Sequence, residues 1–224
     1  NIALKKLIEH TISVYNIQKE FTENASHELQ TPLAIIKNKL DILLQKEDLT
    51  DRQYKLIEDI NKALTRVSRI NKNLLLLAKI ENHQFDENET VSLSELTAQS
   101  LHLLREHFSN KELCVQTEIE TEISVLGNKI LIEILINNLL LNAIRHNLQQ
   151  GIVKISLTKL GLTVTNSGIM ALDKSNLFKR FKKSSIETAG SGLGLAIAEQ
   201  ICKRHHWTIT YHFRQGLHIF EINF

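Results

Sequence analysis

Three residues in the stretch ASHELQTPL, residues 25–33, have side chains suited to group-transfer chemistry. The imidazole of His27 is a nucleophile near neutral pH, and the carboxylate of Glu28 could orient it or accept its proton. Thr31 follows four residues after His27, so a helix would place both on nearly the same line. A solvated helix face with an incidental histidine would look the same, so the other motifs must decide between the two interpretations.

The only proline of the chain, Pro32, lies just beyond this motif. Apolar residues at steps of three and four predict one long amphipathic helix around it; they are Ile17, Phe21, Ala25, Leu29, Leu33, Ile36, Leu40 and Leu43. His27 lies about 200° around the helix from Ala25, so we expect it to face solvent. Proline cannot donate to the carbonyl of Glu28 and crowds it, so the helix should bend here.

A second helical run follows the polar break at residues 46–53 and ends near Glu81, with Thr50 or Asp51 as the expected N-cap. The two runs predict an antiparallel hairpin. Such a hairpin cannot bury both of its apolar faces, so we expect it to dimerise into a four-helix bundle. The alternative is that the apolar stripe docks on the rest of the same chain.

The polar, acidic segment 81–90 is the expected linker, and beyond it helix and strand signals alternate irregularly. Ser94 is a possible helix cap. Strands are expected near 152–159 and 161–166, and a closing hairpin around Gln215 and Gly216. This mixture lacks regular βαβ alternation and predicts an α+β sandwich. We therefore expect two domains, residues 1–84 and 85–224.

The stretch INNLLLNAIRHN places Asn138 and Asn142 four residues apart on one face of an apolar helix. Amides that face a core need partners, which could be neighbouring backbone or a hydrated metal with phosphates. Arg145 and His146 follow within a turn. Farther along, VTNSG ends a predicted strand with Asn166, whose amide could read a base edge.

A glycine-rich loop precedes the last predicted helix, with glycines spaced two apart at Gly190, Gly192 and Gly194. Glycines let backbone N–H groups approach an anion, and a helix N-terminus favours negative charge. The loop is neither a P-loop nor a dinucleotide-binding fingerprint. A mobile turn is the alternative to a phosphate site.

Taken in order, these motifs resemble the kinase core of a two-component sensor histidine kinase over nearly the whole chain. FTENASHELQTPLAII resembles the H box, INNLLLNAIRHN the N box, VTNSG a reduced G1 box, LFKRFKKS the F box and GSGLGLAI the G2 box. The resemblance implies a dimerisation and histidine-phosphotransfer hairpin, followed by an ATP-binding α/β two-layer sandwich of the gyrase and histidine-kinase superfamily. It also implies a protein-histidine kinase that uses ATP and Mg²⁺, with a response-regulator receiver domain as partner.

The resemblance assigns a role to each matching residue. His27 would be the phosphoacceptor, Glu28 the acid/base beside it, and Thr31 would position water to dephosphorylate the regulator. Asn142 would hold Mg²⁺ on the phosphates, supported by Asn138, and Phe178 and Phe181 would anchor the lid. The other implied nucleotide-binding residues are Arg145, His146, Asn166, Gly168, Lys183, Gly190, Gly192 and Gly194.

Three positions depart from the family pattern. Asn166 replaces the usual acidic residue of the G1 box, Ile169 follows Gly168 without a second glycine, and Gln30 replaces a basic residue. These departures leave open a degenerate kinase that acts mainly as a phosphatase or binding module. A dimeric scaffold without chemistry and a DNA-dependent ATPase of the same superfamily are further alternatives.

Composition narrows the class of partner. Lys and Arg total 27 against 25 Asp and Glu, and this near balance gives no argument for a nucleic-acid or membrane-surface partner. Two distant cysteines match no metal spacing, and no apolar run approaches membrane-spanning length. The chain starts without Met and already in helical pattern. We therefore expect the cytoplasmic portion of a longer protein, anchored in the inner or cytoplasmic membrane.

Overall fold

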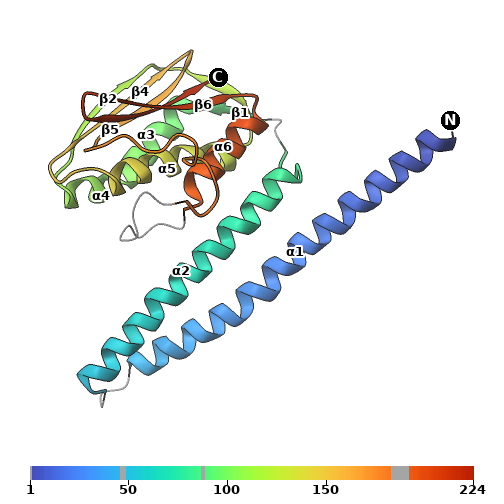
Figure 1. Ribbon diagram of the computed structural model, residues 1–224, viewed down its shortest axis with the longest axis horizontal. Coiled ribbons are helices and arrows are strands. Elements are labelled where there is room, and N and C mark those ends of the chain that lie inside the picture. Colours follow the sequence, from blue (N-terminus) through green and yellow to red (C-terminus); the bar gives the residue numbers. More distant parts are fainter. Residues whose placement is uncertain (1, 46–48, 87–88, 183–191) are drawn as a thin grey trace. The chain divides into compact units, whose positions relative to one another are not determined.

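The computed structural model describes residues 2–45, 49–86, 89–182 and 192–224, without the side chains of residues 2–3, 7–9 and 18–27 (Figure 1). Its contacts divide the chain into two compact units, Asn1–Gln84 and Phe85–Phe224. Each unit has its own secondary structure and is described by itself below.

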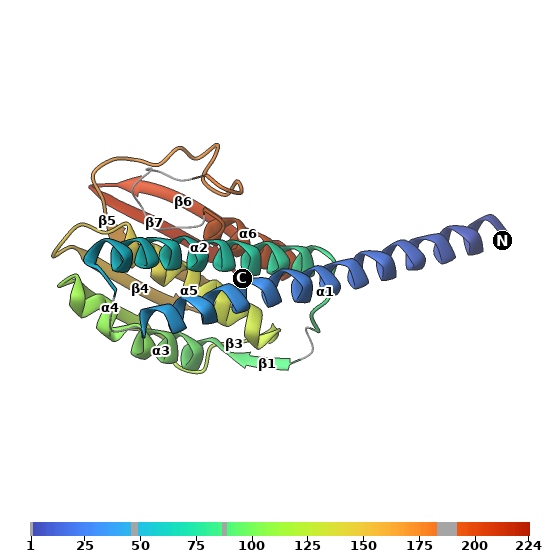
Figure 2. The same cartoon turned by 90° about the horizontal axis from the view of Figure 1, so that it is seen from below.

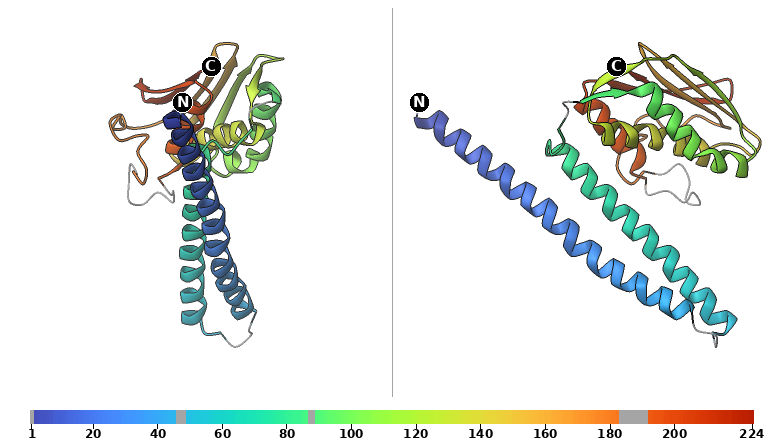
Figure 3. Two further views of the ribbon diagram at one scale, coloured as in Figure 1. Left: turned by 90° about the vertical axis from the view of Figure 1, so that its right-hand side faces the viewer. Right: turned by 180° about the vertical axis from the view of Figure 1, so that it is seen from behind.

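The first unit is an antiparallel hairpin of two long helices, α1 (Ile2–Leu44) and α2 (Asp51–Glu81), which lie side by side in both views of Figure 3. Pro32 lies inside α1 and does not end it. Thr50 is the N-cap of α2, which confirms one of the two expected caps. Its hydroxyl accepts a hydrogen bond from the backbone N–H of Gln53, whose side chain accepts one from the backbone N–H of Thr50.

Two sets of apolar side chains run along each helix of the hairpin. Leu40 of α1 and Ile57 and Leu64 of α2 form the buried cluster between the helices, with Leu33 packed against it. A second set at heptad spacing stays between 36% and 51% exposed in the single chain; it comprises Leu29, Ile36 and Leu43 of α1 and Ile60, Val67 and Leu74 of α2. Leu29, which the periodicity places with Leu33 on one stripe, therefore belongs to the uncovered stripe.

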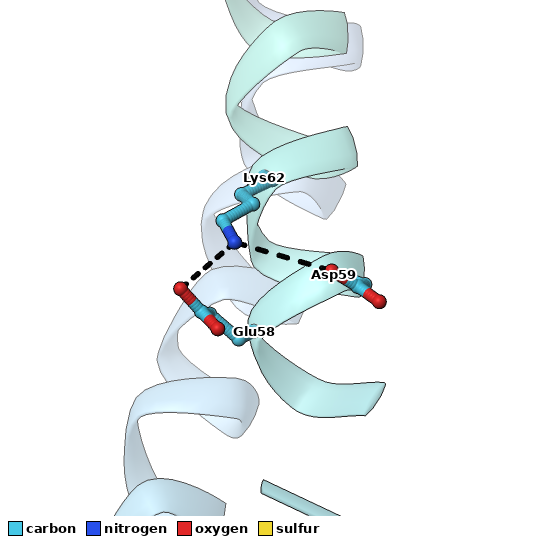
Figure 4. Close-up of polar contacts among 3 residues, drawn as sticks. All are labelled: Glu58, Asp59 and Lys62. Carbon is cyan, nitrogen blue, oxygen red and sulfur yellow. Dashed lines mark ion pairs between the residues drawn. The ribbon is translucent and has the colours of Figure 1, made fainter. Parts of the chain in front are cut away.

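Charged residues mark a third face of α2. The ammonium group of Lys62 lies 2.8 Å from a carboxylate oxygen of Glu58 and 4.0 Å from one of Asp59, and all three side chains are exposed (Figure 4). The hydrogen bond from Lys62 to Glu58 raises the pKa of the ammonium group. Exposed pairs of this kind contribute little to stability. Lys62 lies about 200° around the helix from Ile60, so this charged face of α2 is separate from the apolar stripe that contains Ile60.

The second unit is built on a five-stranded sheet in the order β2-β4-β5-β7-β6. Strands β2 and β4 are parallel, and every other neighbouring pair is antiparallel. The strands are β2 (Cys114–Ile119), β4 (Ile152–Thr158), β5 (Gly161–Ser167), β6 (Thr208–Arg214) and β7 (Leu217–Asn223). A separate antiparallel pair joins β1 (Glu89–Ser92) to β3 (Ser124–Gly127).

Helices cover one face of this sheet, which confirms the predicted two-layer sandwich (Figures 1 and 2). They are α3 (Leu93–Leu103), α4 (Arg105–Asn110), α5 (Lys129–Arg145) and α6 (Gly194–Arg204). The central helix α5 buries eight apolar side chains, which is why its sequence reads as apolar almost all round. Val153, Ile155 and Leu157 of β4 alternate with more exposed residues and supply buried apolar side chains from the sheet.

One expected cap is wrong. Ser92, not Ser94, is the N-cap of α3, and its hydroxyl accepts from the backbone N–H of Glu95. The Ser94 hydroxyl instead donates to the carbonyl of Glu120 at 2.7 Å and accepts from the N–H of Ile123 at 3.0 Å. These two long-range bonds use the hydroxyl that would have capped the helix. None of the described helices combines the length and hydropathy that a bilayer crossing requires.

Candidate functional site

The histidine motif lies on α1 in the first unit. The backbone of His27 is helical, and its predicted exposure concerns a side chain outside the described set. The side chains of Glu28, Thr31 and Pro32 are all exposed. A carboxylate and a hydroxyl one turn apart are therefore exposed beside the position of His27.

In the second unit, two distant motifs meet where α5 faces the start of α6. Asn138 and Asn142 are half-buried on α5, as the predicted amide face requires. A Cβ atom placed on Gly194 would lie 3.1 Å from the amide oxygen of Asn138, so the first turn of α6 packs directly against this face. The Asn142 side chain has no hydrogen-bond partner among the described residues. Its amide remains available to a bound group.

The glycine loop is joined to the F box through backbone atoms. Gly192 has a φ of +69°, and a Cβ there would lie 2.9 Å from the Lys182 carbonyl oxygen. The N–H of Phe181 donates to the Gly192 carbonyl at 2.9 Å, while the Phe181 ring is 54% exposed. Phe178 is half-buried. Among the described contacts, Phe181 thus links to the loop by its backbone; Lys183 and Gly190 lie outside the described residues.

The N-terminus of α6 offers backbone donors beside this loop. Its N-cap is Leu193, a buried apolar residue, and no described side chain caps the first turn. The first N–H groups of a helix have no partner within the helix. Together with Gly192 and Gly194, this end of α6 has the donor set that phosphate oxygens require.

Asn166, near the end of β5, is the most distinctive polar residue of the site. It is 1% exposed, and its side-chain nitrogen donates to the carbonyl oxygens of Ser167 at 2.9 Å and of His146 at 3.5 Å. Both amide hydrogens are thereby engaged, which sets the orientation of the amide. Its oxygen is buried and has no partner among the described residues. An unpaired buried acceptor costs about 1–3 kcal/mol, so this position suits a ligand that donates a hydrogen bond.

Arg145 and His146 lie at the C-terminal end of α5. The Arg145 side chain is exposed. The backbone carbonyl of Arg145 accepts a hydrogen bond from the ammonium group of Lys111 at 3.0 Å. Burial is the main cause that lowers the pKa of His146, and the charges of Arg145, Lys111 and His218 lower it further. His146 is therefore neutral at pH 7 and gives the Asn166 side of the site no positive charge.

The structure gives a steric reason for a glycine at position 168, which the sequence alone did not reveal. A Cβ on Gly168 would lie 2.0 Å from Nε2 of His218, a buried residue of β7 that pairs with Asn166 in the sheet register. The His218 ring thus fills the space of a side chain at position 168. His218 belongs to no cluster of His, Cys, Asp or Glu that could hold a metal ion among the described residues. Pairing β5 with β7 in register would have shown its proximity to Asn166.

Comparison with protein families gives two matches along the chain. Residues 17–83 match the His Kinase A phospho-acceptor domain. Residues 127–222 match the histidine kinase-, DNA gyrase B- and HSP90-like ATPase. Each match falls within one of the two structural units.

Curated relatives include two staphylococcal proteins named heme sensor protein HssS. The protein from Staphylococcus saprophyticus is 35% identical over 203 residues, which cover 87% of this chain and 44% of the relative. The protein from Staphylococcus aureus strain Newman is 34% identical over 215 residues, covering 92% of this chain and 46% of the relative. The chain therefore spans less than half the length of these relatives.

Solved structures share the fold. Full-length ShkA in complex with AMPPNP matches with a TM-score of 0.71 at 16% identity, over 91% of this chain and 45% of that chain. The histidine kinase AdeS of Acinetobacter baumannii matches with a TM-score of 0.61 at 24% identity, over 88% and 96%. At these identities the likeness establishes the arrangement of the elements.

Two histidines of the second unit, the half-buried His146 and the buried His218, predict a pH dependence of stability. Burial is the largest cause that lowers the pKa of both His146 and His218 below the ordinary value of 6.5. The unfolded chain therefore binds more protons than the folded one as pH falls below about 6.5, and the free energy of unfolding must decrease there. Urea unfolding, followed by fluorescence of the single Trp207 in this unit, checks this at pH 7.5 and 5.5.

The matched comparison uses two variants. His146→Gln should lose less stability than the wild type between these pH values, because it lacks one of the two groups. His102→Gln, at an exposed position of α3, should behave like the wild type. Identical pH dependence in all three proteins would contradict this assignment.

Proposed function

We propose that this chain, which belongs to the sensor histidine kinases of two-component systems, autophosphorylates on His27 and passes the phosphoryl group to an aspartate of a response-regulator receiver domain. The kinase class follows from the two family matches. The observation that carries the residue assignments is the arrangement of α5, β5 and α6. These elements bring an unpaired buried acceptor, an amide face and a glycine loop into one unit.

The base of ATP is assigned to Asn166. The amide oxygen of Asn166 would accept a hydrogen bond from the exocyclic amine of adenine, which satisfies the acceptor that the fold leaves unpaired. An amide makes a weaker bond than the carboxylate usual in this family, since neutral pairs are weaker than charge-assisted ones. His146 and Arg145 would flank the nucleotide from the end of α5.

The phosphates are assigned to the amide face and the glycine loop. Asn142 would hold Mg²⁺ through its amide oxygen, and Asn138 would support it beside Gly194. Mg²⁺ would neutralise charge that develops on the phosphoryl oxygens. Gly192 and the first N–H groups of α6 would bind the phosphate oxygens, and we assign Lys183 and Gly190 to the same role by motif position.

His27 and Glu28 carry out the transfer step. A lone pair on an imidazole nitrogen of His27 attacks the γ-phosphorus, and the bond to the ADP oxygen breaks in line. Glu28 orients the ring and takes the proton of the imidazole as positive charge develops. The product is an N-phosphorylated histidine with ADP as the leaving group.

Replacing the phosphoacceptor tests this directly. His27→Ala should reduce incorporation of label from γ-³²P-ATP to background, and the wild-type label should be lost in acid and stable in base. His10→Ala, which removes a histidine elsewhere on α1, should label like the wild type. Undiminished label in His27→Ala would show that another residue accepts the phosphoryl group.

The nucleotide assignment has its own test. Asn166→Leu should raise the Kd for Mg-ATP about tenfold, because removing a hydrogen-bonded buried group costs about 1–3 kcal/mol. Thr163→Val, three residues before Asn166 on β5 and on the other side of the sheet, should bind like the wild type. Calorimetric titration measures both. Equal affinity in Asn166→Leu and the wild type would remove Asn166 from the site.

The proposed partner of the helical hairpin is the hairpin of a second copy of this chain. The uncovered heptad stripes of α1 and α2 have the spacing of a helix-bundle interface, and each helix of the pair contributes one. Two copies that join these stripes would form the four-helix bundle, with residues 1–84 as the dimerisation unit. This arrangement leaves the faces with Glu28 and Lys62 open to solvent.

Phosphatase activity toward the regulator is assigned to Thr31. Its side chain is exposed one turn from His27, so its hydroxyl could position a water on a docked phosphoaspartate. Thr31→Ala should keep autophosphorylation and lengthen the lifetime of the phosphorylated receiver domain severalfold. Thr65→Ala, at an exposed position of α2, is the control. Equal lifetimes for Thr31→Ala and the wild type would contradict the role.

The need for ATP determines on which side of a membrane the kinase unit must lie. Intact cells keep ATP in the cytoplasm, so the second unit must face it, and a membrane-anchored protein would expose this chain on that side. The sensor relatives, which are more than twice as long as their matched regions, are consistent with a separate input region.

A further inference from the structure

The segment from Gly168 to Leu172 connects β5 to the F box, and exposed side chains make up its middle. Ile169 is 82% exposed and Met170 is 70% exposed, while Ala171 also faces solvent. No side chain in this stretch is buried, so apolar packing does not hold it in place. Its conformation depends on contacts at its two ends.

Both ends are tied to the β6–β7 hairpin. The N–H of Gly168 donates to the carbonyl of Gly216 at 2.8 Å. The N–H of Leu172 donates to the hydroxyl of Tyr211 at 2.9 Å, so the phenol oxygen is the acceptor there. These bonds fix the chain direction immediately after Asn166, the residue assigned to the base.

His218 lies next to both of these hydrogen bonds. The Tyr211 hydroxyl lies 2.9 Å from Nδ1 of His218, and the opposite edge of the same ring, at Nε2, fills the space beside Gly168. The Tyr211 hydroxyl, which accepts from the N–H of Leu172, is therefore also within hydrogen-bond distance of the His218 ring. The rings of Phe213 and Phe220 pack around the pair, with centroids 5.0 Å from His218 and 5.1 Å from Tyr211.

We propose that Tyr211 and His218 are a positioning pair for nucleotide binding, which holds residues 168–172 in the conformation that places Asn166 and the start of the lid around ATP. The family assignment uses neither residue. The inference rests on the proposed ATP site, because the held segment follows directly after Asn166. The pair touches no reacting atom and acts through the backbone of Gly168 and Leu172.

The central experiment compares Tyr211→Phe with Thr208→Val in the full chain. Tyr211→Phe keeps the ring and its packing and removes only the hydroxyl. It should raise the KM for ATP in autophosphorylation about fivefold, the effect of one lost net hydrogen bond, and leave the rate at saturating ATP within about twofold. Thr208→Val removes a hydroxyl that accepts from Asn223 at the other end of the same hairpin and should change neither value.

Hydrogen–deuterium exchange without nucleotide separates this proposal from the kinase assignment. In Tyr211→Phe, peptides that cover residues 168–172 should exchange faster, and peptides from β4 and α5 should not change. An unchanged KM together with unchanged exchange would overturn the proposal, as would faster exchange throughout the unit. If the wild type failed to use ATP, the proposed function would fail, while exchange would still decide whether Tyr211 holds the segment.

A second pair of variants tests the contact made by His218. Gly168→Ala should weaken ATP binding, because its Cβ would collide with the His218 ring. Adding His218→Ala should restore part of the affinity, since the smaller residue vacates that space. A double variant no better than Gly168→Ala would overturn the role of His218.

Discussion

The antiparallel pairing of β5 with β7 determines the layout of the second unit. It aligns Asn166 with His218 and Val164 with Phe220, so that one face of both strands turns toward the helices. A shift of one residue would send each of these side chains to the opposite face of the sheet. The buried contacts of Leu162, Val164 and Phe220 resist that shift because they would all be exposed together. Hydrophobic packing thus fixes the place of the polar residues Asn166 and His218.

The first unit follows a different rule. Its helices bury one heptad stripe within the hairpin and leave another uncovered. The proposed association with a second copy would therefore add to the stability of the folded unit. Glu28 and Thr31 belong to neither of these two apolar stripes. With the proposed partners, the hairpin would combine a dimer interface and an open surface for phosphotransfer on the same pair of helices.

The helices, the strands and the order of the motifs could be predicted from the sequence, because local patterns of residues determine them. Periods of 3.6 and 2 gave the helices and strands, Thr50 carried a capping signature, and five motifs in order indicated the kinase core. The predicted cap at Ser94 is wrong because Ser92 and Ser94 look alike in the sequence, and only the folded chain brings Glu120 and Ile123 to the hydroxyl of Ser94. The Tyr211–His218 contact could not be predicted either. It depends on strand register and ring packing across the sheet, and neither residue belongs to a recognised motif.

If Asn166 binds the base as proposed, its amide has a consequence for which nucleotide the protein selects. Its two hydrogens are engaged by the carbonyls of Ser167 and His146, so the buried oxygen is the atom of the amide left without a partner. A purine with a carbonyl at the corresponding edge, as in guanine, would bring two acceptors together with no hydrogen between them. Selection of adenine over guanine would then come from repulsion between the Asn166 oxygen and the purine carbonyl, since both are acceptors. Since an amide does not titrate, this selection would persist at acidic pH, where a carboxylate would become a donor as well.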